Sequence, residues 1–155
     1  KYIFENDDEA AAQIMHAANY GGRAINIAQT TAAHAMSYKI TSMYGLPHGH
    51  AVAVCLPEIW EYMTVHTEQC IDKRGADYVK GVFELIANAM GTKVSEEAIA
   101  IFRRMMKVLE LANPMVLSDK NEELDLLSKS VNPVRLRNNP IMLGNVIPII
   151  NYCGW

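Results

Sequence analysis

Residues 31–60 read TAAHAMSYKITSMYGLPHGHAVAVCLPEIW and carry a pattern of two helices joined by a short turn. Apolar residues at helical spacing predict a helix over residues 31–44, which Gly45 and Pro47 end. A second helix is expected to begin at His48 and to continue to about residue 65. Because the turn between them is short, the two helices are expected to pack as an αα-hairpin.

The residues before this hairpin predict another helix. Asn6 and Glu9 have the spacing of a capping box, so the helix is expected to begin after Asn6. Gly21 and Gly22 are expected to interrupt it, because a glycine inside a helix costs about 1 kcal/mol relative to alanine. Thr30 and Thr31 are then expected to begin the next helix, with a threonine hydroxyl as its cap.

Residues after the hairpin are also helical in pattern. We expect a helix over residues 76–90 that Gly91 ends, and a helix that Ser95 caps and that ends near Asn113. Further helices are expected over residues 119–130 and as one last short helix or turns in the proline-containing tail. No stretch shows sustained strand alternation. The sequence therefore predicts a single all-α domain over residues 1–155, a bundle of about six or seven helices.

Composition narrows the class of protein. Of 155 residues, 14 are Lys or Arg and 17 are Asp or Glu, so the net charge is −3, and there is no basic stripe. This argues against a nucleic-acid partner. No apolar run is long enough to cross a bilayer, so no membrane partner is expected either. Three widely spaced cysteines form no CxxC pair, which favours a reducing, cytoplasmic location.

For two groups of side chains the sequence predicts a structural role rather than a catalytic or binding one. Cys55 lies in an apolar segment and is expected to be buried. Arg103, Arg104 and Lys107 share a helix with several glutamates and are expected to form a solvated face.

His34 and His48 are the candidates for metal binding. In an αα-hairpin they can converge on one point between the helices, and two neutral imidazoles suit a divalent metal such as iron or zinc. A histidine on a helix is, however, more often a surface or core residue than a ligand. Two ligands are also too few for such a metal, and Glu58 and Glu61 lie too far along the second helix to complete the set.

The same stretch resembles a known family. Gly21-Gly22-Arg23-Ala24, then His34-Ala35, then Pro47-His48-Gly49, then Leu56-Pro57 is similar to the iron-containing (group III) alcohol dehydrogenases, which show AG-x-A, HAxxH, PHG and LP segments. The residues around His34 also look like the branch that reduces phosphonoacetaldehyde. The resemblance implies that His34 and His48 are metal ligands. It covers about 40 residues closely.

The sequence departs from that family pattern at several points. Tyr38 stands where the family has the second His of HAxxH, and Val52 stands where it has Asn. The segment from His48 to Ala53 looks somewhat like HGxAVA of the dehydroquinate synthases, which makes a lyase or cyclase domain of that type the alternative. The family's other two ligands, an Asp and a His, and its N-terminal α/β nucleotide-binding domain have no counterpart here. The chain is therefore expected to be the C-terminal part of a longer enzyme.

The resemblance implies a metal-dependent hydride transfer between NAD(P)H and an aldehyde or alcohol. Tyr38 would act on the substrate as the catalytic residue, and Lys39 and His50 would contact it. The cofactors would be Fe2+ or Zn2+ and, in the intact enzyme, NAD(P). The isolated chain is expected to be inactive and to self-associate as a homo-oligomer through the apolar face meant for the absent domain. A non-catalytic helical scaffold is the remaining alternative.

Overall fold

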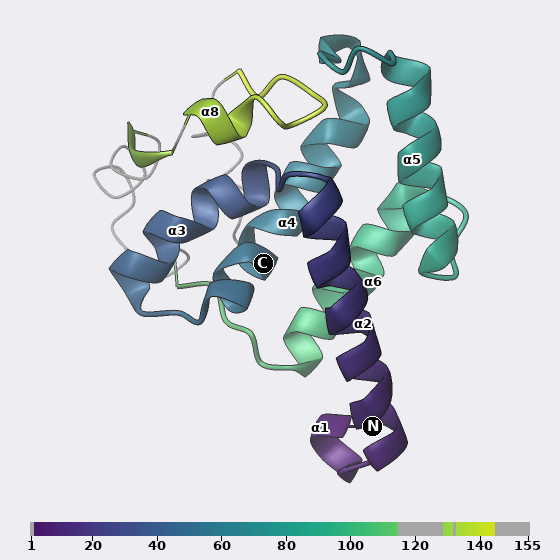
Figure 1. Ribbon diagram of the computed structural model, residues 1–155, viewed down its shortest axis with the longest axis vertical. Coiled ribbons are helices and arrows are strands. Elements are labelled where there is room, and N and C mark those ends of the chain that lie inside the picture. Colours follow the sequence, from purple (N-terminus) through teal and green to yellow (C-terminus); the bar gives the residue numbers. More distant parts are fainter. Residues whose placement is uncertain (1, 115–128, 132, 145–155) are drawn as a thin grey trace. The chain divides into compact units, whose positions relative to one another are not determined.

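The computed structural model describes residues 2–114, 129–131 and 133–144. Within these residues the backbone forms helices and no strand longer than the isolated bridge between Cys70 and Ile141. The predicted all-α class is confirmed (Figure 1). Across the same ranges, no helix combines the length and the apolar character needed to cross a membrane. The chain divides into two compact units, Lys1–Thr30 and Thr31–Trp155.

The first unit contains α1 (Tyr2–Glu5) and α2 (Asp8–Ile27). The cap of α2 is Asp7, whose carboxylate accepts a hydrogen bond of 3.0 Å from the backbone N–H of Ala10. The predicted cap Asn6 is wrong by one residue, because Asn6 adopts a left-handed conformation with φ 51°. The predicted interruption at the paired glycines is also wrong: α2 runs through them without a break. The alanine-rich segments on either side favour helix propagation enough to outweigh the cost of the two glycines.

In the second unit, α3 (Ala32–Tyr44) and α4 (His48–Val65) form the predicted hairpin, with bounds close to those expected (Figure 1). Gly45 ends α3 with φ 66°, a left-handed conformation that glycine adopts without a Cβ penalty, and its N–H donates to the carbonyl of Thr41 at 2.9 Å. Of the two threonines expected to begin α3, Thr31 stands at the N-cap, but its hydroxyl makes no capping bond, so the predicted hydroxyl cap is wrong.

The core of this unit lies between α3, α4 and the two helices that follow. All but one of the buried residues of α3 are apolar; they are Ala32, Ala33, Ala35, Met36, Ser37 and Ile40. Cys55 is buried as predicted, and burial raises the pKa of its thiol to about 12. The largest fully buried apolar side chains are Met36, Ile40, Val54, Ile59, Ile99, Met106 and Ile141.

The remaining elements are η1 (Thr67–Gln69), α5 (Ala76–Ala89), α6 (Ser95–Val108) and α8 (Pro133–Leu136). Gly91 follows the end of α5 with φ 78°, which confirms its predicted place as the helix-ending glycine. The short α8 accords with the expected last short helix in the tail.

Two predictions about α6 are wrong. Ser95 is its first helical residue rather than its cap, and Val94 holds the cap position. A carboxylate oxygen of Glu97 instead lies 3.3 Å from the backbone nitrogen of Lys93. The helix ends at Val108 rather than near residue 113, because Glu110 adopts a left-handed conformation with φ 54°. The helix predicted over residues 119–130 falls almost wholly outside the described residues.

Candidate metal centre

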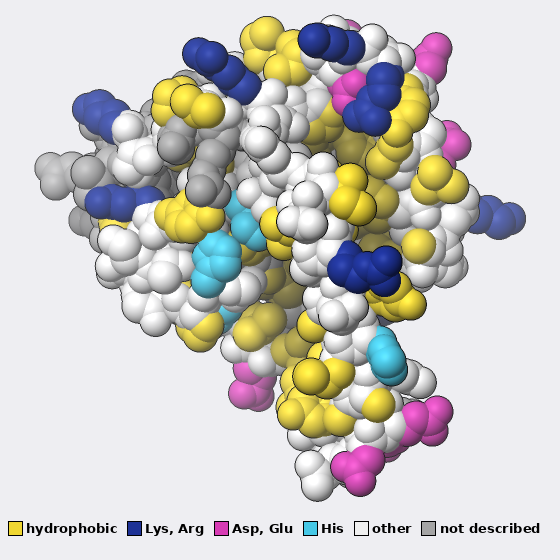
Figure 2. All heavy atoms as spheres, in the orientation of Figure 1, with side chains coloured by type: hydrophobic (Ala, Val, Ile, Leu, Met, Phe, Trp, Pro, Cys, Tyr) yellow, Lys and Arg dark blue, Asp and Glu magenta, His cyan; other side chains and the backbone are white. Residues whose placement is uncertain are grey.

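The α3–α4 hairpin brings the rings of His34 and His48 together. Their centroids are 5.4 Å apart, with planes inclined at 63°. His34 stands in the first turn of α3 and is half-buried, and His48 is the first residue of α4 and is exposed. Figure 2 shows histidine side chains at the molecular surface on the side of α3 and the start of α4. The expected convergence of the two rings is present, and both rings can be reached from solvent.

Tyr38 joins this pair from one helical turn further along α3. Its ring centroid lies 5.3 Å from that of His48, with the planes tilted by 31°. The side chain is 47% exposed. A phenol in this position can donate a hydrogen bond to an oxygen atom held next to the two imidazoles.

Ser37 lies next to the His48 ring and was not identified from the sequence. The residue is fully buried, and its Oγ donates a 2.9 Å hydrogen bond to the carbonyl of His34. The same Oγ lies 3.5 Å from Nδ1 of His48. A signal existed: Ser37 follows His34 by three residues and so shares its helix face, among alanine, methionine and isoleucine side chains.

His50 points to a different part of the unit. Its Nε2 lies 2.8 Å from the carbonyl oxygen of Ala112. Because a carbonyl oxygen can only accept, Nε2 is protonated and donates this hydrogen bond. The bond ties the first turn of α4 to the segment that follows α6. That segment borders a pocket of about 460 Å³ lined by Met106, Lys107, Glu110, Leu111, Ala112 and Asn113.

Lys39 is half-buried and is not joined to the histidine pair. Within the described residues it makes no hydrogen bond or ion pair. Its predicted contact with substrate, like that of His50, stays a prediction.

At this place the described residues bring together two imidazoles that could serve as metal donors. Among them, no group of three or more His, Cys, Asp or Glu side chains could hold a metal ion together. Glu58 and Glu61 on α4 are engaged elsewhere, with Arg103. Two imidazoles fit part of an iron or zinc donor set, and a complete set would need donors beyond the described residues.

The predicted solvated face of α6 is wrong at Arg103. Its guanidinium donates to Oε1 of the buried Glu58 at 2.7 and 3.2 Å, and to Oε2 of Glu61 at 2.6 Å. Burial lowers the pKa of Arg103, but the hydrogen bonds to Glu61 and Glu58 raise it more, so the net shift is upward. These bonds hold α6 against α4. Arg104 is exposed as predicted.

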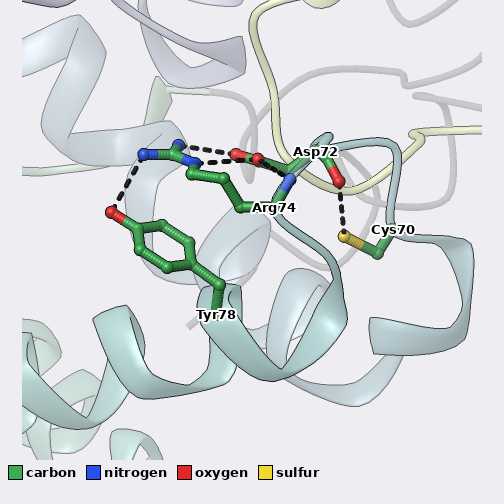
Figure 3. A network of polar contacts seen from close by, with 4 residues as sticks. All are labelled: Cys70, Asp72, Arg74 and Tyr78. Carbon is green, nitrogen blue, oxygen red and sulfur yellow. Dashed lines mark hydrogen bonds and ion pairs between the residues drawn. The ribbon is translucent and has the colours of Figure 1, made fainter.

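A second polar network lies in the turn before α5 (Figure 3). Arg74 donates to both carboxylate oxygens of Asp72 at 2.9 and 2.7 Å, and to the hydroxyl of Tyr78 at 2.9 Å. The hydrogen bonds from Arg74 lower the pKa of Asp72 to about 2. The thiol of Cys70 lies 3.9 Å from the Asp72 carbonyl. The side chains of Asp72, Arg74 and Tyr78 are thus bonded to one another and connect the turn to the start of α5.

Comparison with known proteins places the chain in a family. The profile of the Fe-containing alcohol dehydrogenase family, C-terminal, matches residues 2–143. The chain belongs to this family, and the resemblance found in the sequence is confirmed.

Three relatives are dehydrogenases or related enzymes. The chain is 37% identical over 98 residues to a phosphonoacetaldehyde reductase of Streptomyces viridochromogenes, covering 63% of this chain and 25% of the relative. It is 30% identical over 147 residues to a probable mitochondrial hydroxyacid-oxoacid transhydrogenase of Dictyostelium discoideum (83% and 25%). It is 28% identical over 111 residues to a 1,3-propanediol dehydrogenase of Klebsiella pneumoniae (72% and 27%).

The chain thus spans about a quarter of the length of these curated relatives. A phosphonoacetaldehyde reductase is among them, in agreement with the branch that the residues around His34 resemble. No solved structure was found to match the chain.

Proposed function

We propose that this chain is the metal-binding C-terminal part of an iron-type alcohol dehydrogenase that transfers a hydride between NAD(P)H and an aldehyde or alcohol. The observation that carries the proposal is the distance of 5.4 Å between the ring centroids of His34 and His48, which one short hairpin brings together. Family membership and the dehydrogenase names of the relatives support it. The lyase or cyclase alternative has no such support among these three relatives.

His34 and His48 would hold the metal, Fe2+ or Zn2+, through one imidazole nitrogen each. The resemblance implies an Asp and a His as the remaining donors, and the described residues hold no such pair beside these rings. When bound, the metal would act as a Lewis acid on a carbonyl or alkoxide oxygen. Either metal accepts two or three imidazoles with a carboxylate, so the donor set leaves iron and zinc both open.

Tyr38 would orient the substrate at this place. Its ring flanks His48, and its exposed phenol can donate a hydrogen bond to a substrate oxygen. Lys39 would favour an anionic substrate, and the relative named phosphonoacetaldehyde reductase acts on an anionic one. The bond from Nε2 to Ala112 fixes the His50 ring, and His50 would contact substrate through the part of the ring that this bond leaves open.

Catalysis would require more than this chain. Two imidazoles are an incomplete donor set, and the sequence has no glycine-rich phosphate loop after a strand for NAD(P). We therefore expect the 155-residue chain by itself to reduce no aldehyde, and to work with a nucleotide-binding domain. Homo-oligomer formation and a cytoplasmic location stay predictions, as does the alternative role of a scaffold.

Metal titration of the purified chain tests the proposal. Zn2+ binding is measured by calorimetry for the parent chain, for the His34→Ala/His48→Ala double variant, and for His66→Ala as control. His66 follows the far end of α4, about 27 Å along the helix from His48. We expect weak binding in the parent and in the control, and none in the double variant. Equal binding in all three would contradict the proposal and favour the scaffold role.

A further inference from the structure

A buried hydroxyl group links the two candidate metal ligands. Ser37 is 0% exposed, and its Oγ lies 2.9 Å from the carbonyl oxygen of His34 and 3.5 Å from Nδ1 of His48. One side chain thus touches the backbone of one ligand residue and the ring of the other. It lies on the face of α3 that packs against α4 and has no access to substrate.

Proton accounting decides the direction of the second contact. A serine hydroxyl has one hydrogen and two acceptor lone pairs. A carbonyl oxygen can only accept, so the 2.9 Å contact with His34 takes the hydroxyl hydrogen, as serines inside helices often do with a preceding carbonyl. The lone pairs of Oγ then face Nδ1 of His48. That contact is favourable only when Nδ1 carries a proton.

We propose that Ser37 is a positioning residue that holds His48 as the Nδ1–H tautomer and leaves Nε2 with its lone pair for a metal. The ring of Tyr38, 5.3 Å from His48, restrains the imidazole from another side. Metal-binding histidines commonly donate their second ring N–H to a neighbouring acceptor, which fixes the tautomer and the ring direction. Here the acceptor is a hydroxyl whose own hydrogen is already committed.

The tautomer is a property of the metal-free chain, and the role toward a metal rests on the function proposed above. The first test is therefore made without metal. Histidine side chains of the full chain are labelled with 15N, and two-bond 1H–15N correlations are recorded at pH 8.5, where imidazoles are neutral. We expect His48 in the Nδ1–H form in the parent chain. We expect Ser37→Ala to move it toward the Nε2–H form, and Ser42→Ala, an exposed serine of the same helix, to leave it unchanged.

The second test measures Zn2+ affinity by calorimetry. We expect Ser37→Ala to weaken binding by about tenfold, the size of effect typical of lost outer hydrogen-bond partners, and Ser42→Ala to have no effect. A parent chain whose His48 is mainly Nε2–H overturns the proposal, and this result does not require the variant to fold. The proposal is also overturned if His48 keeps its tautomer in folded Ser37→Ala.

The two proposals fail separately. If Ser37→Ala shifts the tautomer while the His34→Ala/His48→Ala variant binds Zn2+ like the parent, the tautomer assignment stands and the metal site does not. If the histidine variant loses Zn2+ binding while the Ser37→Ala variant keeps both tautomer and affinity, the metal site stands and the role of Ser37 does not.

Discussion

Removing the charge of Arg103 should destabilise the second unit more than any other single charge change on α6. Arg103→Met keeps most of the aliphatic stem but removes three hydrogen bonds and leaves Glu58 without its cation. Breaking a fully buried ion pair from one side costs about 3–5 kcal/mol. The Glu58 side chain is 6% exposed, but that of Arg103 is 29% exposed, so water can partly replace the lost partner. The bond to the half-exposed Glu61 adds at most about 1 kcal/mol. We therefore expect Arg103→Met to lower the free energy of unfolding by about 2–3 kcal/mol.

Urea unfolding at pH 7, followed by far-UV circular dichroism, measures this loss. The midpoint should fall with an unchanged m value, because the surface exposed on unfolding is the same. Arg104→Met is the matched control: it removes an exposed arginine from the next position and should stay within about 0.5 kcal/mol of the parent. Glu58→Gln combined with Arg103→Met should cost less than the sum of the two single changes, because they remove the same interaction. If Arg103→Met is as stable as Arg104→Met, the ion pair does not hold α6 to α4 and the argument is refuted.

Three further predictions concern the turns and the buried thiol. The pKa of Asp72 is lowered, so its pairing with Arg74 stabilises the fold at pH values above the ordinary pKa of 3.8, and this stabilisation is lost as the pH falls toward about 2. Arg74→Ala should raise the Asp72 pKa toward 3.8 in an NMR titration, and an unchanged pKa would refute the pairing. At pH 8 the Cys55 thiol, with its pKa near 12, should resist iodoacetamide in the native chain while Cys70 is modified, as peptide mass spectrometry would show; equal labelling would contradict its burial. Gly45→Ala should lower the free energy of unfolding by about 1 kcal/mol in urea, because φ 66° strains any side chain; no change would mean that the turn readily relaxes.

The hairpin could be predicted nearly to the residue, because its limits depend on local signals. Gly45 and Pro47 end one helix and open the next whatever the rest of the chain does. The capping predictions at Asn6 and Ser95 failed for a different reason. A neighbouring residue takes the cap position, Asp7 in one case and Val94 in the other, and backbone conformation decides between neighbours.

The candidate site divides in the same way. The proximity of the His34 and His48 rings could be predicted because one short hairpin carries both residues. The contacts of Ser37 and Arg103 could not be predicted, since they depend on partners that packing supplies: a ring 11 residues away for Ser37, and a carboxylate 45 residues away for Arg103. For Ser37, the three-residue spacing from His34 indicates only a shared helix face. A serine among apolar residues and an arginine among glutamates look ordinary in the sequence until those partners are known.

The three-residue turn between α3 and α4 also bears on how this region would respond to metal during folding. Only 14 positions separate His34 from His48, so closing the loop between them costs little conformational entropy. A pair formed by such local contacts can assemble early, before the more distant contact between α4 and α6. An ion that binds only the folded pair of histidines stabilises the folded state by mass action. Once the ion concentration exceeds the dissociation constant, this stabilisation grows with the logarithm of the concentration. A metal bound at the proposed site would therefore stabilise the folded hairpin by an amount that depends on the metal concentration.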